Sequence, residues 1–200
     1  MSFEKVKAAL LERDFSVSEF ATASEAADYL DRKIDRQEVS LGGSLTLSQM
    51  GLPKRLATHN KLILPSVIYE DVDCEVDAAR AATCTVFLTS VNALSETGEM
   101  VSIDGIGNRI ASMLYGHQKV YFVIGKNKLT PDYDSAVWRA RNISAPKNAA
   151  RLQRKTPCAV SGHCHDCRSP ERICRGMVIL WEKMYKSEME VVLIDEELGL

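Results

Sequence analysis

The chain has 200 residues, of which 46% are hydrophobic and 26% are charged, and its formal net charge is −2. These proportions are typical of one compact globular domain over residues 1–200, and they exclude disordered and fibrous proteins. The slightly negative charge argues against nucleic acid as a partner. No stretch approaches the ~20 apolar residues that cross a bilayer, and residues 1–5 lack the apolar core of a signal peptide. We therefore expect no membrane insertion and a cytoplasmic protein.

Helices and strands alternate along the first ninety residues. Helical spacing of apolar residues and short β-branched runs, separated by turn residues, distinguish the two kinds of element. The predicted elements are, in chain order, a helix over 3–11, an extended piece over 15–22, a helix over 23–34, a strand over 38–41, a helix over 45–52, a strand over 61–64, a helix over 73–82 and a strand over 85–89. This alternation predicts an α/β fold with a mostly parallel sheet covered by helices.

The second half of the chain adds two predicted hairpins to this pattern. A turn at residues 96–99 joins two strands within 93–103, and the apolar runs 177–181 and 190–194 form a closing hairpin. Between them we expect the remaining elements, which are a helix over 110–115, a strand over 119–125, helices over 131–142 and from 146 to 153, and a cysteine-rich segment over 157–175.

The segment from Asp104 to Arg109 lies between a strand and a helix, where an open α/β sheet presents its ligand crevice. Gly105 and Gly107 let the backbone approach a ligand closely, and Arg109 can form a forked pair with a carboxylate or phosphate. The structural alternative is a tight turn in which Asn108 caps the helix and Arg109 forms an ion pair within the protein.

Two further groups are candidates for ligand binding. Gly42, Gly43 and Ser44 join a strand to a helix and can hold phosphate oxygens, although Ser44 is equally suited to capping the helix. Glu96, with Glu99, can meet Asp104 in a hairpin and perform acid–base chemistry, or these carboxylates are exposed turn charges. The predicted ligand-binding residues are therefore Gly42, Gly43, Ser44, Glu96, Asp104, Gly105, Gly107, Asn108 and Arg109.

Four of the six cysteines fall within 17 residues, at Cys158, Cys164, Cys167 and Cys174. Four thiolates can bind one zinc ion or one iron–sulfur cluster, and the spacing does not distinguish the metals. The alternatives are redox thiols, whose pKa values His163, His165 and Arg168 can lower, or inert cysteines. Cys74 and Cys84 stand apart, and we expect both to be small buried residues.

The sequence resembles the lactate-utilisation (LUD) domain family, formerly an uncharacterised bacterial family. The resemblance extends over most of residues 1–200 and rests on five segments. These segments are 89–98, the run Asp104-Gly105-Ile106-Gly107-Asn108-Arg109, Val123-Ile124-Gly125-Lys126-Asn127-Lys128, Ala145-Pro146-Lys147-Asn148-Ala149, and the cysteine block continuing to 192–200.

The resemblance implies a fold like that of the glucosamine-phosphate deaminase, ribose-phosphate isomerase and CoA-transferase group. It also implies a subunit of a lactate (2-hydroxy acid) oxidation system that binds a small anionic ligand between the Gly42 and Gly105 turns. Because the longer members carry a ferredoxin domain that these residues lack, we expect iron–sulfur partner proteins. The same redox setting favours a [4Fe–4S] cluster over zinc at the four cysteines.

Two other classes of function stay open. One is a non-enzymatic metal-binding interaction module whose cysteine segment docks a redox partner. The other is an isomerase or transferase that acts on a sugar phosphate or acyl-CoA. The sequence does not decide whether the chain is an enzyme by itself, since fold analogy alone supplies no reaction.

Overall fold

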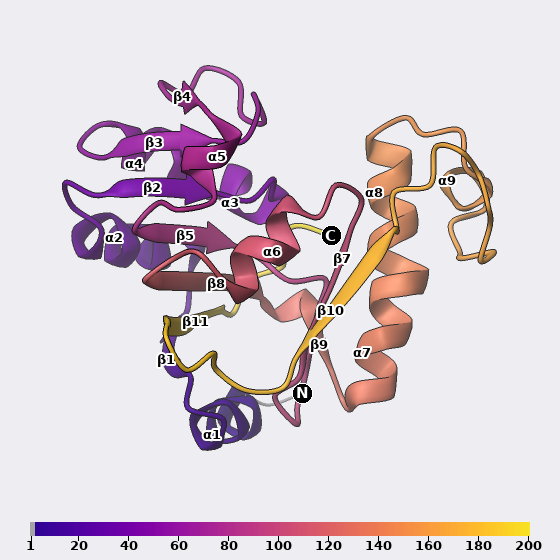
Figure 1. Cartoon of the computed structure of the whole chain (residues 1–200). Helices are drawn as coiled ribbons and strands as arrows, with labels where there is room; N and C mark the ends of the chain where they lie inside the picture. Colours follow the sequence, from indigo (N-terminus) through magenta and orange to yellow (C-terminus); the bar gives the residue numbers. More distant parts are fainter. Residues whose placement is uncertain (1–2) are drawn as a thin grey trace.

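Seven parallel strands form the central sheet in the computed structural model, which describes residues 3–200 (Figure 1). The strands are β1 (Ser16–Phe20), β2 (Glu38–Leu41), β3 (Lys61–Leu64), β4 (Glu75–Val76), β5 (Val86–Thr89), β8 (Lys119–Gly125) and β11 (Glu188–Ile194). Their order across the sheet is β1–β11–β8–β5–β2–β3–β4, and every neighbouring pair is parallel. Residues 1 and 2, on which part of the signal-peptide expectation rests, lie outside the described residues.

The middle strands are apolar on both faces because helices cover both sides of the sheet. In β8, Tyr121 and Val123 join the hydrophobic cluster on one face, whereas Val120, Phe122 and Ile124 join the cluster on the other. β11 divides its side chains between the same two clusters. Two cores therefore hold the sheet in place, one on each face.

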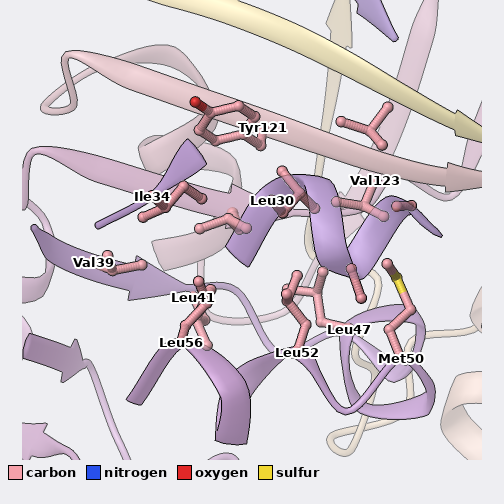
Figure 2. Close-up of a cluster of buried hydrophobic side chains, with 14 of the residues drawn as sticks. Leu30, Ile34, Val39, Leu41, Leu47, Met50, Leu52, Leu56, Tyr121 and Val123 are labelled. Carbon is pink, nitrogen blue, oxygen red and sulfur yellow. The ribbon is translucent and has the colours of Figure 1, made fainter. Parts of the chain in front are cut away.

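Helices on either side of the sheet complete these cores. The first eight elements of helix are α1 (Phe3–Glu12), α2 (Ala23–Lys33), α3 (Leu45–Gln49), α4 (Leu52–Ala57), α5 (Ala78–Ala81), α6 (Asn108–Leu114), the 3₁₀ turn η1 (Lys126–Lys128) and α7 (Tyr133–Arg139). Leu30 from α2, Leu47 from α3 and Leu56 from α4 belong to the same buried cluster as Tyr121 and Val123 of the sheet (Figure 2). α1 and α6 contribute to the opposite core.

A second, four-stranded sheet lies beside the first and carries the longest helical segment (Figure 1). Its order is β10 (Gly176–Leu180), β7 (Met100–Asp104), β6 (Ala93–Ser95) and β9 (Leu129–Thr130). β6 and β7 pair antiparallel, which confirms the predicted hairpin over 93–103. Ala136 and Ala140 pack against Ala93 and Val101 of this sheet.

The helices expected over 131–142 and from 146 are joined without a break. A π-helical turn, η2 (Ala140–Ser144), connects α7 to α8 (Ala145–Arg151), and a short α9 (Pro157–Ser161) follows. The Ala145 N–H donates to the Ala140 carbonyl, five residues earlier. Pro146 explains the wider turn, because proline lacks an N–H and its ring clashes with the carbonyl four residues earlier.

The predicted closing hairpin is wrong. The run 177–181 lies in β10, which pairs antiparallel with β7 of the second sheet. The run 190–194 lies in β11, which pairs in parallel with both β1 and β8 in the central sheet. The two runs are thus neighbours in sequence but belong to different sheets, and the polar segment between them crosses from one sheet to the other.

The helix expected over 73–82 is also shorter than predicted. Glu75–Val76 pairs with β3 as the edge strand β4, and the helix begins only after Asp77, whose carboxylate accepts hydrogen bonds from the N–H groups of Ala79 and Arg80. The α/β class with a mostly parallel sheet covered by helices is confirmed. Across residues 3–200, no helix combines the length and apolar character needed to cross a membrane.

Candidate functional site

A cavity of about 290 Å³ lies at the carboxyl ends of three adjacent parallel strands. Its lining includes residues 43–46 after β2, residues 90–92 after β5, and Lys128 after β8. Residues 103–106, Asn108, Arg109 and the helix α8 close the other sides, whereas the predicted Gly107 is not among the lining residues. This is the edge where open α/β sheets bind ligands, because the connections leaving parallel strands diverge there.

The two predicted glycine turns meet at this cavity. A Cβ atom on Gly42 would lie 2.8 Å from Thr89 Oγ1 and 3.1 Å from Arg109 Cγ and Cδ. A Cβ atom on Gly105 would lie 2.8 Å from the carbonyl oxygen of Ile173. Both glycines are therefore needed for close approach, Gly42 against the Arg109 side chain and Gly105 against the backbone of the cysteine-rich segment.

The guanidinium of Arg109 donates hydrogen bonds to four acceptors of the protein around the cavity. Its Nη1 donates to the Ser90 carbonyl at 3.0 Å and to Ser102 Oγ at 3.3 Å. Its Nη2 donates to the Ile103 carbonyl at 2.5 Å and to Asn92 Oδ1 at 3.3 Å. Burial lowers the pKa of the guanidinium. Because these acceptors occupy its fork, Arg109 fixes the loops after β5 and β7.

Asp104 shapes the turn that precedes α6. Its Oδ1 accepts hydrogen bonds from the N–H groups of Ile106 and Gly107, at 3.0 and 3.1 Å. Its Oδ2 has no hydrogen-bond partner among the described residues and lies 3.7 Å from Arg109 Nε. Gly107 takes the N-cap position with a φ of 98°, so Asn108 is not the cap that the structural alternative expected; it lines the cavity.

Ser44 serves as a helix cap at the edge of the cavity. Its Oγ accepts a hydrogen bond from the Leu47 N–H at 3.4 Å, in the N-cap position of α3. Tyr69 holds the same turn, since its hydroxyl donates to the Gly42 carbonyl at 2.6 Å and accepts from the Ser44 N–H. Gly43 and Ser44 both line the cavity.

Lys128 is the functional candidate that the sequence reasoning missed. Only 3% of the residue is exposed, and Nζ donates to Thr46 Oγ1 at 2.8 Å and to Ser90 Oγ at 2.7 Å. The residue lines the cavity. The feature of the sequence that could have identified Lys128 is its position in the segment 123–128, directly after the central strand β8. Residues at this position lie at the edge where parallel sheets bind ligands.

Positive charges outnumber negative ones in the cavity lining. The basic residues are three arginines, namely Arg109, which is half-buried, and Arg151 and Arg154, which are exposed at the rim, together with the buried Lys128. Asp104 is the single residue with a carboxylate side chain in this lining. A concave surface with this balance concentrates field lines and attracts anions.

Glu96 is not brought to the cavity. It follows β6 in the hairpin turn, at the opposite end of β7 from Asp104, and it forms an ion pair with Lys5 at 3.9 Å. Its neighbour Glu99 forms an ion pair with Arg13 at 2.6 Å. The proposed meeting of these carboxylates with Asp104 is therefore not formed.

The four clustered cysteines surround the short helix α9 and the loop after it. Their thiols are free and partly exposed. Cys174 Sγ accepts a hydrogen bond from Arg172 Nε at 3.1 Å, and Cys158 Sγ lies 3.3 Å from Thr156 Oγ1. Within residues 3–200, no group of three or more His, Cys, Asp or Glu side chains is placed to hold one metal ion. The four-cysteine centre stays a prediction from sequence.

The cysteine-rich segment nevertheless borders the cationic cavity. Cys164 and Cys174 line a second cavity of about 310 Å³, and Ile103 and Ala145 line both cavities. Ile173 lines the first cavity, directly before Cys174. The two cavities thus share a wall. Away from this region, Cys84 is buried, as predicted, whereas Cys74 is only half-buried.

Comparison with known proteins identifies a family and a shared fold. The model of the LUD domain matches residues 3–194. The structure is similar to that of a DUF162 family protein from Deinococcus radiodurans, with 12% identity, a TM-score of 0.52, and coverage of 96% of this chain and 94% of that one. At this identity, the likeness shows the fold alone.

A second solved structure, eIF2B beta from Chaetomium thermophilum, is similar over 56% of this chain and 44% of that one. Its identity is 15% and its TM-score of 0.43 is too low to support an argument. No curated protein matches the sequence.

Proposed function

We propose that this chain, which belongs to the LUD domain family, is a subunit of a system that oxidises lactate or a related 2-hydroxy acid. In this proposal the cavity at the ends of β2, β5 and β8 binds the small carboxylate ligand. The observation that carries the proposal is the charge of the cavity, in which three arginines face one carboxylate side chain.

The size of the cavity favours a small acid over the alternative substrates. Its volume of about 290 Å³ lies at the lower limit of ligand pockets, which span ~300–1,000 Å³. An acyl-CoA or a sugar phosphate needs more room than a three-carbon acid. We therefore place the isomerase and transferase alternatives behind the proposed binding of a small carboxylate.

The oxidation itself is assigned to a complex. Removing two electrons from a 2-hydroxy acid is chemistry that a cofactor normally carries. We propose that iron–sulfur partner proteins accept the electrons and that this chain binds the acid. Dye reduction that depends on lactate should then require the partner proteins, and steady reduction by this polypeptide alone would contradict the subunit role.

Isothermal titration of the purified chain with lactate, pyruvate and ribose phosphate tests the binding step. We expect the two carboxylates to bind, with affinity that falls as salt is added, because exposed rim charges are screened. The double variant Arg151→Gln/Arg154→Gln should bind about tenfold more weakly, since exposed ionic contacts contribute up to ~1 kcal/mol each.

The control is Arg168→Gln, which removes an exposed arginine that does not line the cavity. It should leave the affinity unchanged. Equal affinities of the double variant and the wild type, or binding of the sugar phosphate without the carboxylates, would contradict the proposed function.

A further inference from the structure

Lys128 combines burial with access to a cavity. Its amine, Thr46, Ser90 and Gly199 all line the space at the end of β8. Gly199 lies directly over the amine, because a Cβ atom at that position would come 3.1 Å from Nζ and 2.4 Å from Thr46 Oγ1. The amine is therefore enclosed by protein but reaches the space where a ligand would lie.

The charges around this amine disfavour its protonated form. Across residues 3–200, no carboxylate lies within ion-pair distance of Nζ. Burial is the main cause that lowers its pKa to about 7, and the charges of Arg139 and Arg109 add to this effect. Desolvation and an adjacent cation are the two conditions that activate lysine as a nucleophile in proteins.

The hydrogen bonds match a neutral amine. A neutral amine has two hydrogens and one lone pair, and Nζ donates to two hydroxyl oxygens, on Thr46 and Ser90. Thr46 in turn donates its hydroxyl hydrogen to the Leu198 carbonyl at 3.4 Å, so its oxygen is oriented to accept from Lys128. Both amine hydrogens are then used, and the lone pair is left for a ligand.

We propose that Lys128 forms a covalent imine with a 2-oxo acid, the class of compound that results from oxidation of a 2-hydroxy acid. This deepens, and rests on, the proposed function. Nζ adds to the carbonyl carbon, the C–O bond breaks, and the oxygen leaves as water with the two amine hydrogens. No electrons are gained or lost in this step, and water reverses it.

The cavity supplies what such a ligand requires beside the amine. The 2-oxo acid carries a carboxylate next to its carbonyl. The positive charge of Arg109, which lines the same cavity, attracts this carboxylate. In this proposal the carboxylate lies towards Arg109 and the carbonyl carbon lies at Nζ. Selection of an oxo acid over a neutral ketone follows from this charge.

Borohydride trapping tests the proposal with pyruvate as the probe. The wild-type chain is incubated with pyruvate and cyanoborohydride, which reduces an imine to a stable secondary amine, and peptide mass spectrometry locates the adduct. We expect one adduct per chain, at Lys128. Acetone, which has a carbonyl but no carboxylate, should label at least tenfold more slowly.

Two variants give the matched comparison. Lys128→Arg should lose the adduct, whereas Lys126→Arg should keep it, since Lys126 is exposed and forms an ion pair with Asp195 at 3.0 Å. Because the position of the adduct is read from the wild-type peptide, the test does not depend on the folding of either variant.

The outcomes separate this proposal from the proposed function. Pyruvate that binds in calorimetry but gives no adduct, or an adduct spread over exposed lysines, overturns the imine and leaves the proposed binding intact. Equal labelling by acetone overturns the role of the cavity charge. The absence of both binding and adduct overturns both proposals.

Discussion

Replacing Lys128 by Met should stabilise the fold at pH 6. The pKa of the amine falls from 10.5 to about 7 on folding, which corresponds to about 5 kcal/mol against the folded state when the amine is protonated. Met keeps the length and apolar stem of the side chain but leaves the hydroxyls of Thr46 and Ser90 without their donor. Losing these hydrogen bonds costs ~1–3 kcal/mol, so the free energy of unfolding should rise by about 2–4 kcal/mol.

The gain should depend on pH in a defined direction. The folded pKa of Lys128 lies below its unfolded value, so the cost is complete below pH 7 and is lost as the pH rises towards 10.5. About 2 kcal/mol remains at pH 9, at ~1.4 kcal/mol per pH unit. The neighbouring charges of Arg109 and Arg139 stay constant across this range. The advantage of the variant should therefore disappear near pH 9.

Urea unfolding of both proteins at pH 6, 7, 8 and 9 measures the effect, with the m-value checking that the unfolded states are comparable. Lys126→Met is the control, because it removes an exposed lysine and a surface ion pair and should change stability by less than ~1 kcal/mol. A Lys128→Met protein that is less stable than the wild type by the same amount at every pH would refute the reasoning.

Three further changes test the walls of the two cavities. Arg109→Lys removes the fork that bonds to the Ser90 and Ile103 carbonyls and should lower the free energy of unfolding by ~2–3 kcal/mol in urea titration; an unchanged value would contradict the structural role of the fork. Gly105→Ala forces a methyl group against the Ile173 carbonyl and should cost ~1–3 kcal/mol, whereas Gly43→Ala, with nothing within 4 Å of its added Cβ, should stay within ~0.5 kcal/mol; equal costs would show that Gly105 does not make this contact. In a thiol titration of the folded, metal-free protein, the four clustered cysteines should react and buried Cys84 should not; one bound metal per chain that Cys167→Ser abolishes would instead support the four-cysteine centre.

Most of the central sheet could be predicted from local patterns. Strand and helix patterns alternate at close intervals along the first ninety residues, and this alternation requires crossover connections between parallel strands. The hairpin over 93–103 was equally local, because its turn residues and both strands lie within twelve positions. Elements that form with their sequence neighbours are therefore the ones that sequence reasoning identified.

The closing hairpin failed because two apolar runs around a polar turn do not reveal their partners. The distinguishing signal was the run itself, since six of the seven residues of β11 are buried, as expected for a strand covered on both faces. β10 has a single buried residue. Two strands with such different burial do not belong side by side in one hairpin.

The predicted site was partly correct because glycines and a strand-to-helix turn mark close backbone approach. Gly43 and Gly105 both line the cavity, and Gly42 packs against the Arg109 side chain beside it. The hydrogen-bond partners of Arg109 could not be predicted from the sequence. Its acceptors, the carbonyls of Ser90 and Ile103, come close to it only when the second sheet has formed. The same holds for the contact between Gly105 and Ile173, which joins residues 68 positions apart.

Lys128 shows that a charged residue directly after a buried strand is a stronger candidate for a functional site than one in an ordinary loop. The residue type alone predicts that Lys128 is exposed, since lysine is almost never fully buried unless it is paired. Its neighbour Lys126 meets that expectation, whereas Lys128 turns inward under Gly199 and bonds only to hydroxyls. Burial of Lys128 disfavours its protonated form, which costs folding free energy. Residues with pKa values shifted in this way occur most often at functional sites. Stability and reactivity at Lys128 therefore have one cause, so the pH at which Lys128→Met loses its advantage and the pH at which pyruvate labelling rises should both follow the same amine.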